Sequence, residues 1–231
     1  MKKLVIAIDG PAASGKSTTA RLVARKLGYL HIDTGAMYRA ITLRVLEEKI
    51  SLDDDARIGA LAEKTDVRLE RLEEENKVYL SDRDVSRAIR NPEVTRSVST
   101  VSSYPAVRSV MVREQRKLAA RGGVVLEGRD IGTVVLPEAD LKIYLVANVA
   151  ERARRRKKEL DLAGEKIEEQ KLVQELIDRD TRDSSREISP LRKADDAVEI
   201  DTSHLTIEQQ VEFIVRRAKE IIKKLNASHY R

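Results

Sequence analysis

Residues 10–17 read Gly-Pro-Ala-Ala-Ser-Gly-Lys-Ser, and the expected fold is built around this loop. It has the form Gly-x-x-x-x-Gly-Lys-Ser/Thr, whose backbone closes around phosphate groups. An apolar run at residues 4–8 precedes it, and a helical pattern follows it as far as Gly28, a residue typical of helix ends. The order strand, glycine-containing loop, helix predicts a phosphate-binding loop, and the alternative is an ordinary glycine-rich turn.

The residue types in this loop fit the chemistry of phosphate binding. Gly10 and Gly15 let backbone N–H groups approach phosphate oxygens, and the positive end of the following helix attracts the anion. Lys16 adds positive charge at the terminal phosphates, and we expect its side chain on the loop surface. Ser17 offers a hydroxyl ligand to Mg²⁺. We expect ATP phosphates to bind Gly10, Pro11, Ala12, Ala13, Ser14, Gly15, Lys16, Ser17 and Thr18.

Length and composition set broad limits on the function. The 231 residues suit one α/β domain with insertions, or at most two small domains. The net charge of +5 fits an anionic ligand, either nucleotide or nucleic acid. The absence of cysteine excludes disulfides and thiolate zinc sites and favours the reducing cytoplasm. The apolar stretch after the first three residues is too short for a signal peptide, and no run approaches the roughly 18 apolar residues of a membrane span. We therefore expect a cytoplasmic protein that does not bind a membrane.

Apolar runs alternate with helical patterns along the chain. Apolar runs typical of buried parallel strands lie at residues 4–8, 31–33, 124–126, 141–146 and 197–200. Helical patterns follow the loop, span residues 36–48, and run from Thr206 to Leu225, where Gln209 completes a capping box. Five strands interleaved with helices predict an α/β fold with a doubly wound, parallel, five-stranded sheet in a single domain over residues 1–231.

Two stretches interrupt this alternation. Residues 66–90 alternate apolar and charged positions around a polar interruption at 73–76, which predicts a small antiparallel β insertion within residues 62–92. The simpler alternative is a surface hairpin without a role. Residues 151–187 are rich in arginine and lysine, and such runs are usually solvated helix faces, which is our interpretation of Lys157 and Lys158.

Three further motifs lie near the ends of predicted strands. Residues 33–39 read Asp-Thr-Gly-Ala-Met-Tyr-Arg, residues 127–133 read Glu-Gly-Arg-Asp-Ile-Gly-Thr, and residues 179–186 read Arg-Asp-Thr-Arg-Asp-Ser-Ser-Arg. The carboxyl ends of parallel strands form the ligand crevice of such sheets, and arginine is well suited to bind anions there. Two simpler interpretations stay open, namely a structural Arg129–Asp130 ion pair and a solvated helix end at 179–186.

Together with the loop, these motifs resemble the bacterial cytidylate kinases, a family of nucleoside monophosphate kinases, from Ile8 to the C-terminal helix. The resemblance implies a P-loop kinase fold in which the insertion at 62–92 binds the monophosphate and residues 151–180 form a short helical lid. It implies transfer of a phosphoryl group from ATP to CMP or dCMP, with Mg²⁺, in pyrimidine metabolism. The expected partners are these nucleotides and not nucleic acid, and we expect a monomer.

The resemblance also implies roles for individual residues. The positions that hold the acceptor phosphate are matched by Thr34, Arg39 and Arg129. The positions that read the cytosine are matched by Ser99, Arg108 and Asp130. Near the sugar and the phosphates, the matching residues are Arg179, Asp183 and Arg186. The residues expected to act in catalysis are Lys16, Arg129 and Arg186.

Two places depart from the family pattern. Residues 12–14 read Ala-Ala-Ser where relatives often have Ser-Gly-Ala, and Glu127 stands where Asp is common. We expect Glu127 to assist Ser17 in holding Mg²⁺ through water. Both departures keep the chemical groups that the site needs, but they leave the rigidity of the loop and the surroundings of the metal open.

Physical chemistry supports the same interpretation. Phosphoryl transfer gives a protein little covalent work, so alignment and positive charge dominate. Lys16, the arginines at 39, 129, 179, 182 and 186, and the lid arginines near 152–156 supply that charge. No general base is required, because the oxygen of an acceptor phosphate is already an anionic nucleophile.

Other functions stay open at this stage. A different small-molecule kinase could use Asp33 or Asp130 as a base toward a hydroxyl acceptor. A nucleotide sensor or nucleic-acid-binding protein could use the loop only to bind, although aromatic residues, at 3% of the chain, offer few stacking platforms. A GTPase is disfavoured, since Asn76-Lys77 continues with Val78-Tyr79 and not with the guanine-selecting Asn-Lys-x-Asp pattern.

Overall fold

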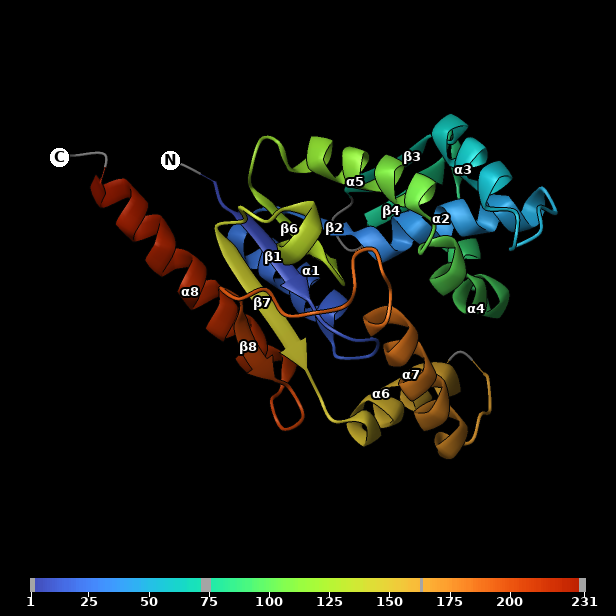
Figure 1. Cartoon of the computed structure of the whole chain (residues 1–231). Coiled ribbons are helices and arrows are strands. Elements are labelled where there is room, and N and C mark those ends of the chain that lie inside the picture. Colours follow the sequence, from blue (N-terminus) through green and yellow to red (C-terminus); the bar gives the residue numbers. More distant parts are fainter. Residues whose placement is uncertain (1–2, 72–75, 163, 229–231) are drawn as a thin grey trace. The chain divides into compact units, whose positions relative to one another are not determined.

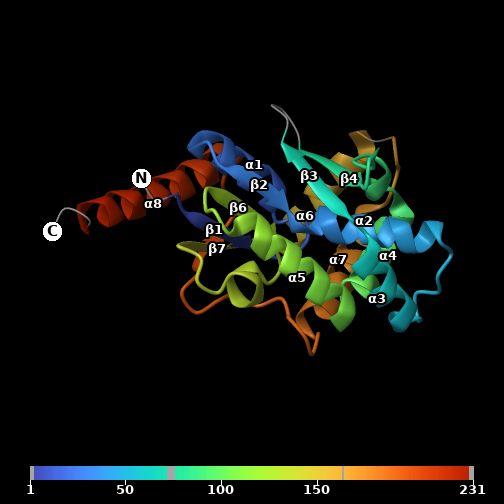
Figure 2. The same ribbon diagram turned by 90° about the horizontal axis from the view of Figure 1, so that it is seen from above.

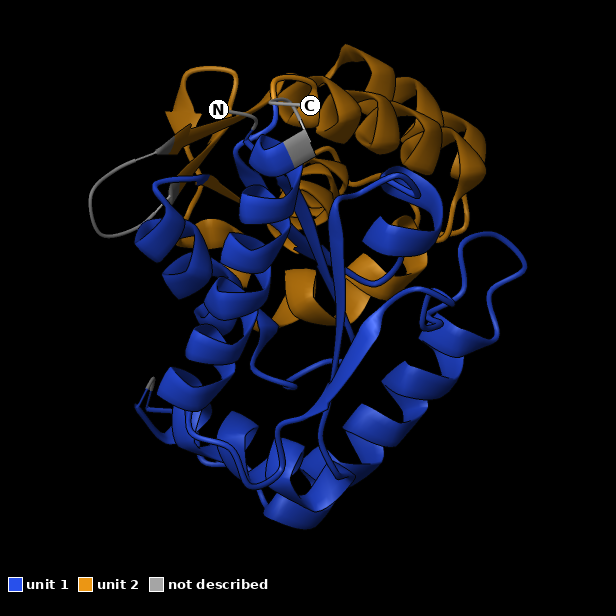
Figure 3. Cartoon of the chain, turned by 90° about the vertical axis from the view of Figure 1, so that its left-hand side faces the viewer, with its two compact units in different colours: residues 1–29, 122–231 blue, residues 30–121 orange. Residues whose placement is uncertain are grey.

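The computed structural model describes residues 3–71, 76–162 and 164–228, and the chain divides into two compact units (Figure 3). Unit 1 comprises residues 1–29 and 122–231, and unit 2 comprises residues 30–121. Unit 2 is therefore one continuous stretch of chain inserted into unit 1. It extends well beyond the predicted insertion at 62–92, because several helices on either side of that insertion belong to the same unit.

The main sheet has five strands, which confirms the predicted α/β fold. Their order is β2-β6-β1-β7-β8, with bounds Leu30–Asp33, Val124–Gly128, Val5–Asp9, Leu141–Val146 and Val198–Asp201. Strand β1 pairs in parallel with β6 on one side and with β7 on the other, and β7 pairs in parallel with β8. All five residues of β6 are buried, as expected for a parallel strand covered on both faces.

The register of the sheet aligns the carboxyl ends of β1 and β6, with β7 beside them. Asp9, the last residue of β1, lies opposite Gly128 of β6 and Tyr144 of β7. Ile8 lies opposite Glu127. The phosphate-binding loop and the motif at 127–133 therefore leave the sheet side by side, at its carboxyl edge.

Two helices cover one face of this sheet (Figures 1 and 2). Helices α1 (Lys16–Leu27) and α8 (Ile207–Ser228) pack together against Ile6 and Ile8 of β1 and against Leu4, which directly precedes that strand. Gly28 ends α1 in the left-handed conformation, at φ 66°. The predicted capping box also forms, since the Gln209 side chain accepts from the Thr206 N–H and the Thr206 hydroxyl accepts from the Gln209 N–H.

Two helices follow β7 in the region predicted to be a lid. Helices α6 (Val149–Leu162) and α7 (Glu169–Ser184) pack against each other through Ala153, Leu160, Leu172 and Leu176. Ala12 of the phosphate-binding loop belongs to the same apolar cluster. The base of this helix pair is thus packed onto the loop.

Unit 2 combines four helices with a small sheet. Besides β2, its elements are α2 (Thr34–Glu47), α3 (Asp55–Lys64), β3 (Val67–Arg71), β4 (Asn76–Leu80), β5 (Arg83–Asp84), a 3₁₀ turn at Ala88–Arg90, α4 (Pro92–Val101) and α5 (Pro105–Ala119). The three strands pair antiparallel in the order β3-β4-β5, which confirms the antiparallel β structure predicted here. Residues 72–75 of that prediction lie outside the described residues.

The small sheet belongs to the core of unit 2. Val78 and Leu80 of β4 are buried in one apolar cluster with Ala36 and Ala40 of α2. The alternative of a surface hairpin without a role is therefore wrong, because its residues complete the core beneath α2. Helix α2 begins at Thr34, two residues before the predicted start. Among the described residues, no helix is long and apolar enough to cross a membrane.

Candidate active site

The phosphate-binding loop connects β1 to α1, as predicted, and its glycines occupy positions that other residues would not tolerate. Gly10 has φ 148°, and a Cβ atom there would lie 2.1 Å from the carbonyl oxygen of Leu145. Gly15 precedes α1 with φ 91°, in the left-handed region. Both conformations are accessible to glycine and strained for residues with a side chain. The sequence Gly10–Gly15 therefore fixes the tight course of the loop.

The Lys16 side chain lies inside the loop, and the prediction that it lies on the loop surface is wrong. Its exposed fraction is 5%, and its Nζ atom donates to the Pro11 carbonyl at 2.6 Å and to Ser14 Oγ at 3.3 Å. The loop folds around the ammonium group because its backbone carbonyl supplies the hydrogen-bond acceptor. Burial, reinforced by the nearby charge of Arg129, lowers the pKa of Lys16 well below its ordinary value. Bound phosphate would favour the charged form.

Ser17 and Glu127 form the pair of oxygen groups expected at a magnesium site. The Ser17 hydroxyl donates to Glu127 Oε2 at 2.7 Å, and Glu127 is buried at the end of β6. Mg²⁺ binds hydroxyl and carboxylate oxygens and retains several waters in nucleotide sites. The donor set fits that chemistry. Within the described residues, no cluster of three or more His, Cys, Asp or Glu side chains forms a separate metal cage.

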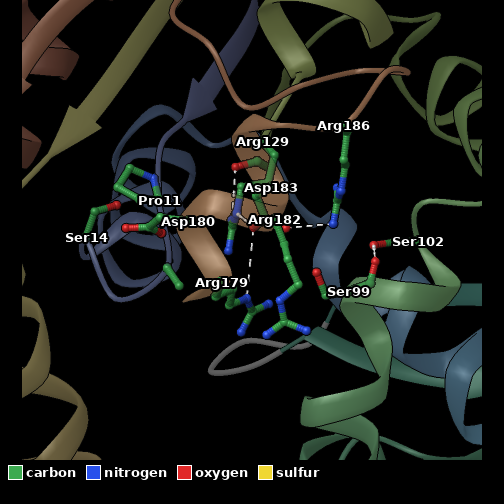
Figure 4. A network of polar contacts seen from close by, with 12 residues as sticks. Pro11, Ser14, Ser99, Ser102, Arg129, Arg179, Asp180, Arg182, Asp183 and Arg186 are labelled. Atoms are coloured by element: carbon green, nitrogen blue, oxygen red, sulfur yellow. Dashed lines mark hydrogen bonds and ion pairs between the residues drawn. The ribbon is translucent and has the colours of Figure 1, made fainter. Parts of the chain in front are cut away.

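Asp183 of α7 is the centre of an arginine cluster (Figure 4). Its carboxylate pairs with Arg186 at 2.6 Å, with Arg129 at 3.1 Å and with Arg179 at 4.0 Å. Burial alone would raise the pKa of Asp183, but the three arginines lower it below its ordinary value. The residues 179–186 are thus more than a solvated helix end. Three arginines around one carboxylate leave positive charge in excess, as phosphate binding requires.

The turn after β6 is held by a carboxylate from β1. Asp9 Oδ1 accepts from the Ile131 N–H at 2.9 Å, and Asp9 Oδ2 accepts from the Gly132 N–H at 2.7 Å. This fixes the turn immediately after Arg129 and Asp130. Burial raises the pKa of Asp9 from 3.8 to about 6, although the two backbone donors oppose that shift.

Arg129 and Asp130 directly follow β6. Arg129 pairs with Asp183, which is distant in sequence, at 3.1 Å. Asp130 is buried, and its backbone carbonyl accepts from the N–H groups of Val134 and Val135.

In unit 2, the motif at 33–39 forms one compact arrangement at the start of α2. Asp33 caps the helix, since its Oδ1 atom accepts from the Ala36 N–H at 2.8 Å, while its Oδ2 atom pairs with Arg39 at 2.9 Å. Burial opposes ionisation of Asp33, but Arg39 and His31 lower its pKa below the ordinary value. Thr34, the first residue of α2, is buried. The motif therefore places the Arg39 guanidinium at a helix N-terminus, a combination suited to an anion.

The residues expected to read the base lie on neighbouring helices of unit 2. Ser99 is on α4 and Arg108 is on α5, and both side chains are buried. Arg108 donates to the Ser102 carbonyl at 3.3 Å and lies over the Tyr38 ring at 5.6 Å. A buried guanidinium of this kind can present a directional donor to a neutral heterocycle.

The lid arginines serve more than one purpose. Arg152 pairs with Asp180 at 2.7 Å and donates to the carbonyls of Ala12 and Ala147. Arg155 also contacts backbone carbonyls, whereas Arg154 is largely exposed. This use of arginine was not predicted from the sequence. A signal for it was the position of Arg152 and Arg155 three residues apart on one helix face.

The comparisons with known proteins agree with this geometry. Residues 6–220 match the family described as cytidylate kinase. The chain is 50% identical over 223 residues to the cytidylate kinase of Bacillus pumilus (strain SAFR-032), covering 96% of this chain and 99% of that protein. It is 48% identical over 219 residues to the cytidylate kinase of Bacillus subtilis (strain 168), covering 95% and 98%.

A solved structure also shares the fold. The crystal structure of an uncharacterized protein from Eubacterium ventriosum ATCC 27560 matches with a TM-score of 0.50 and 12% identity, covering 94% of this chain and 99% of that one. The sequence matches are near full length in both directions, so they concern the whole arrangement and not the phosphate-binding loop alone. The chain belongs to the cytidylate kinase family.

Proposed function

We propose that the protein transfers the γ-phosphoryl group of ATP to CMP or dCMP, giving ADP and CDP or dCDP. Membership of the family supports this reaction. The structural observation that supports it best is the arginine cluster beside the phosphate-binding loop. The cluster surrounds Asp183 and adds its charge to that of Lys16, whose pKa already responds to Arg129 and Arg179. A triphosphate and a monophosphate that react together need this density of positive charge.

The donor phosphates would bind the backbone of residues 10–18. The N–H groups of this loop and of the first turn of α1 would surround the oxygens, and Lys16 would neutralise charge that develops on the transferred group. Ser17 would bind Mg²⁺ directly, and Glu127 would orient a water of the metal through its carboxylate, which already accepts from Ser17. When bound, the metal supplies charge neutralisation to the β- and γ-phosphates.

The acceptor phosphate would be held by Thr34, Arg39 and Arg129. Each arginine already forms an ion pair with a carboxylate, Arg39 with Asp33 and Arg129 with Asp183, which limits its rotational freedom before the ligand arrives. Arginines restrained in this way lose little side-chain entropy when they bind phosphate. Arg179, Asp183 and Arg186 would lie near the sugar and the phosphates.

Cytosine would be read by Ser99, Arg108 and Asp130. Cytosine presents a carbonyl acceptor, a ring-nitrogen acceptor and an amino donor, which match two donors and one carboxylate. All three side chains are buried, so an unmatched polar group there would be costly. We further propose that residues 62–92 bind the monophosphate and that residues 151–180 act as a lid that excludes water from the reaction.

The second candidate, a kinase for a hydroxyl acceptor, is less well supported. Such an enzyme needs an available carboxylate base near the acceptor oxygen. Asp33 fits poorly, because its oxygens are engaged by the Ala36 N–H and by Arg39 and its pKa is lowered. Asp130, the other carboxylate considered as a base, is buried, and we assign it to the amino group of cytosine. A phosphate acceptor requires no base and accounts for the arginines.

The test is an acceptor panel with ATP and Mg²⁺, followed by ADP release. We expect ADP to form with CMP and dCMP, to form much more slowly with UMP and AMP, and to be negligible without an acceptor. Phosphorus NMR of the same mixtures would identify the product as a nucleoside diphosphate. ADP release that is independent of any monophosphate, or that responds only to a hydroxyl compound, would contradict the proposal. Size-exclusion chromatography would test the expected monomer.

A further inference from the structure

A polar junction lies behind the phosphate-binding loop, on the side of its carbonyl groups. The Ser14 carbonyl accepts from the Thr202 hydroxyl at 3.2 Å and from Arg155 Nη1 at 3.5 Å. Thr202 directly follows β8 and is fully buried, and Arg155 lies on α6. The loop, the end of the last strand and the first turns of the lid helix therefore meet at one carbonyl oxygen.

Arg155 is fully engaged at this junction. Its guanidinium donates to the Thr202 carbonyl at 2.6 Å and to Thr202 Oγ1 at 3.1 Å, while Glu151, one turn earlier on α6, accepts from Arg155 Nε at 2.9 Å. Several hydrogen bonds from one planar group fix its orientation more tightly than a single ion pair would. The group is thereby committed to the protein and not to a ligand phosphate.

Thr202 links three chain segments through one hydroxyl. Its Oγ1 atom accepts from Arg155 and lies within donating distance of both the Ser14 carbonyl and the Val146 carbonyl at the end of β7. Because the Arg155 hydrogen bond occupies an oxygen lone pair, the hydroxyl proton is directed toward these carbonyls. The side chain can satisfy this role only through its hydroxyl group.

The position of the Ser14 carbonyl matters for phosphate binding. Ser14 C=O and the N–H of Gly15 belong to one planar trans peptide, so the two groups point in opposite directions. A carbonyl held by Thr202 and Arg155 therefore fixes the direction of the Gly15 N–H, one of the donors of the phosphate cradle. The Ser14 side chain accepts from Lys16 Nζ at 3.3 Å, so the same residue also orients the lysine.

A second contact supports the loop from α8. Gln210 is fully buried, its Oε1 atom accepts from the Thr19 hydroxyl in the first turn of α1 at 2.8 Å, and its amide donates to the Leu205 carbonyl. A Cβ atom on Gly15 would lie 3.7 Å from both Arg155 Nη1 and Gln210 Oε1. The segment after β8 thus encloses the back of the loop with hydrogen-bonding groups.

We infer that Arg155 and Thr202 are positioning residues that hold the phosphate-binding loop in the conformation that binds ATP and connect this loop to the lid helix α6. The inference rests on the proposed function for the identity of the donor nucleotide. It assigns a role in donor binding to two residues that would not touch the phosphates themselves.

The experiment measures binding of ATP-Mg²⁺ and of CMP separately by calorimetry, so that it does not depend on turnover. Thr202→Val removes the hydroxyl at nearly constant volume, and Thr202→Ser restores it. Loss of one such hydrogen bond should weaken ATP binding by about fivefold or more, with CMP binding changed by less than about twofold. Thr202→Ser should bind ATP within about twofold of the wild type.

Arg155→Gln provides a second, independent variant, and Lys158→Gln, an exposed position on the same helix, is its matched control. We expect Arg155→Gln to weaken ATP binding and Lys158→Gln to leave it unchanged. Melting temperatures of all variants identify loss of the fold; if Thr202→Val does not fold, the Arg155→Gln and Thr202→Ser measurements decide. Wild-type ATP affinity in Thr202→Val or Arg155→Gln, or equal losses in Thr202→Val and Thr202→Ser, would overturn the inference. Failure to phosphorylate CMP, with this ATP-binding pattern intact, would instead contradict the proposed function.

Discussion

Each unit of the molecule holds an arginine on a carboxylate, but the two arrangements differ in charge balance. In unit 2, Asp33 pairs with Arg39 at 2.9 Å, and both side chains keep about a fifth of their surface exposed. In unit 1, the almost fully buried Asp183 pairs with Arg129, Arg179 and Arg186. One arrangement is a balanced pair, whereas the other carries excess positive charge.

The difference indicates that the Asp33–Arg39 pair and the cluster around Asp183 have different roles. The balanced pair orients one guanidinium at the N-terminus of α2, and the remaining candidates in unit 2, Ser99 and Arg108, suit directional hydrogen bonds to a base. The cluster in unit 1 instead concentrates positive charge beside Lys16, where phosphoryl transfer requires it. A buried carboxylate keeps such a cluster together without a ligand, because like charges alone would repel.

The largest expected effect comes from removing Lys16. Lys16→Ala should lower the turnover number by about a hundredfold or more, because the ammonium neutralises charge that develops in the transition state. Since the side chain is buried, Lys16→Met, which keeps most of the stem, separates loss of charge from loss of packing. Lys26→Ala, at the exposed end of the same helix, is the matched control. Steady-state kinetics and melting curves test this, and near-normal turnover in Lys16→Met would show that the charge is not used.

The next effect concerns the choice of base. Uracil would present a carbonyl to Asp130 where cytosine presents an amino group, so wild-type kcat/KM should favour CMP over UMP by about a thousandfold. In Asp130→Asn the amide can donate, so kcat/KM for CMP should fall and the CMP/UMP ratio should narrow by at least about tenfold. An unchanged ratio would show that Asp130 does not read the base, and would weaken the assignment of Ser99 and Arg108 as well.

A smaller effect is expected on the pH dependence of stability, through Asp9, which holds the turn after Arg129. The pKa of Asp9 is raised from 3.8 to about 6 in the folded protein, so between these values the folded state binds more protons than the unfolded state. Stability contributed by this group therefore rises as pH falls. From pH 7 to pH 5, the free energy of unfolding of the wild type should increase by about 1 kcal/mol relative to Asp9→Asn. Denaturant unfolding at both pH values measures it, and a constant difference or the opposite sign would refute the raised pKa.

The parts of the site that could be predicted from the sequence are those set by residues close together in the chain. The strand, loop and helix around residues 10–17 follow from a short motif, and the capping box at Thr206 follows from residue types three apart. The fold followed because each buried strand appears as an apolar run. The assignments in unit 2 came from resemblance, since nothing local in Ser99 or Arg108 indicates a base-binding role.

Contacts between distant segments were not predictable in this way. Asp9 binds a turn more than 120 residues later in the chain, and Thr202 binds the Ser14 carbonyl 188 residues earlier. Asp9 could be singled out in the sequence as a charged residue at the end of an apolar strand. Nothing in the sequence indicated that its carboxylate binds the N–H groups of Ile131 and Gly132. Residue type also says little about the course of a long side chain, which is why Lys16 was expected at the surface of the loop that encloses it.

We propose that Arg39 and Arg129, each paired with a carboxylate in its own unit, both bind the acceptor phosphate. Separate calorimetric titrations of ATP-Mg²⁺ and of CMP against the wild type, Arg39→Ala and Arg129→Ala test it most directly. Because hydrogen bonds between charged groups are lost, each variant should bind CMP at least about tenfold more weakly, with ATP affinity within about threefold of the wild type. A loss of ATP affinity with CMP affinity unchanged would place these arginines on the donor side and contradict the account.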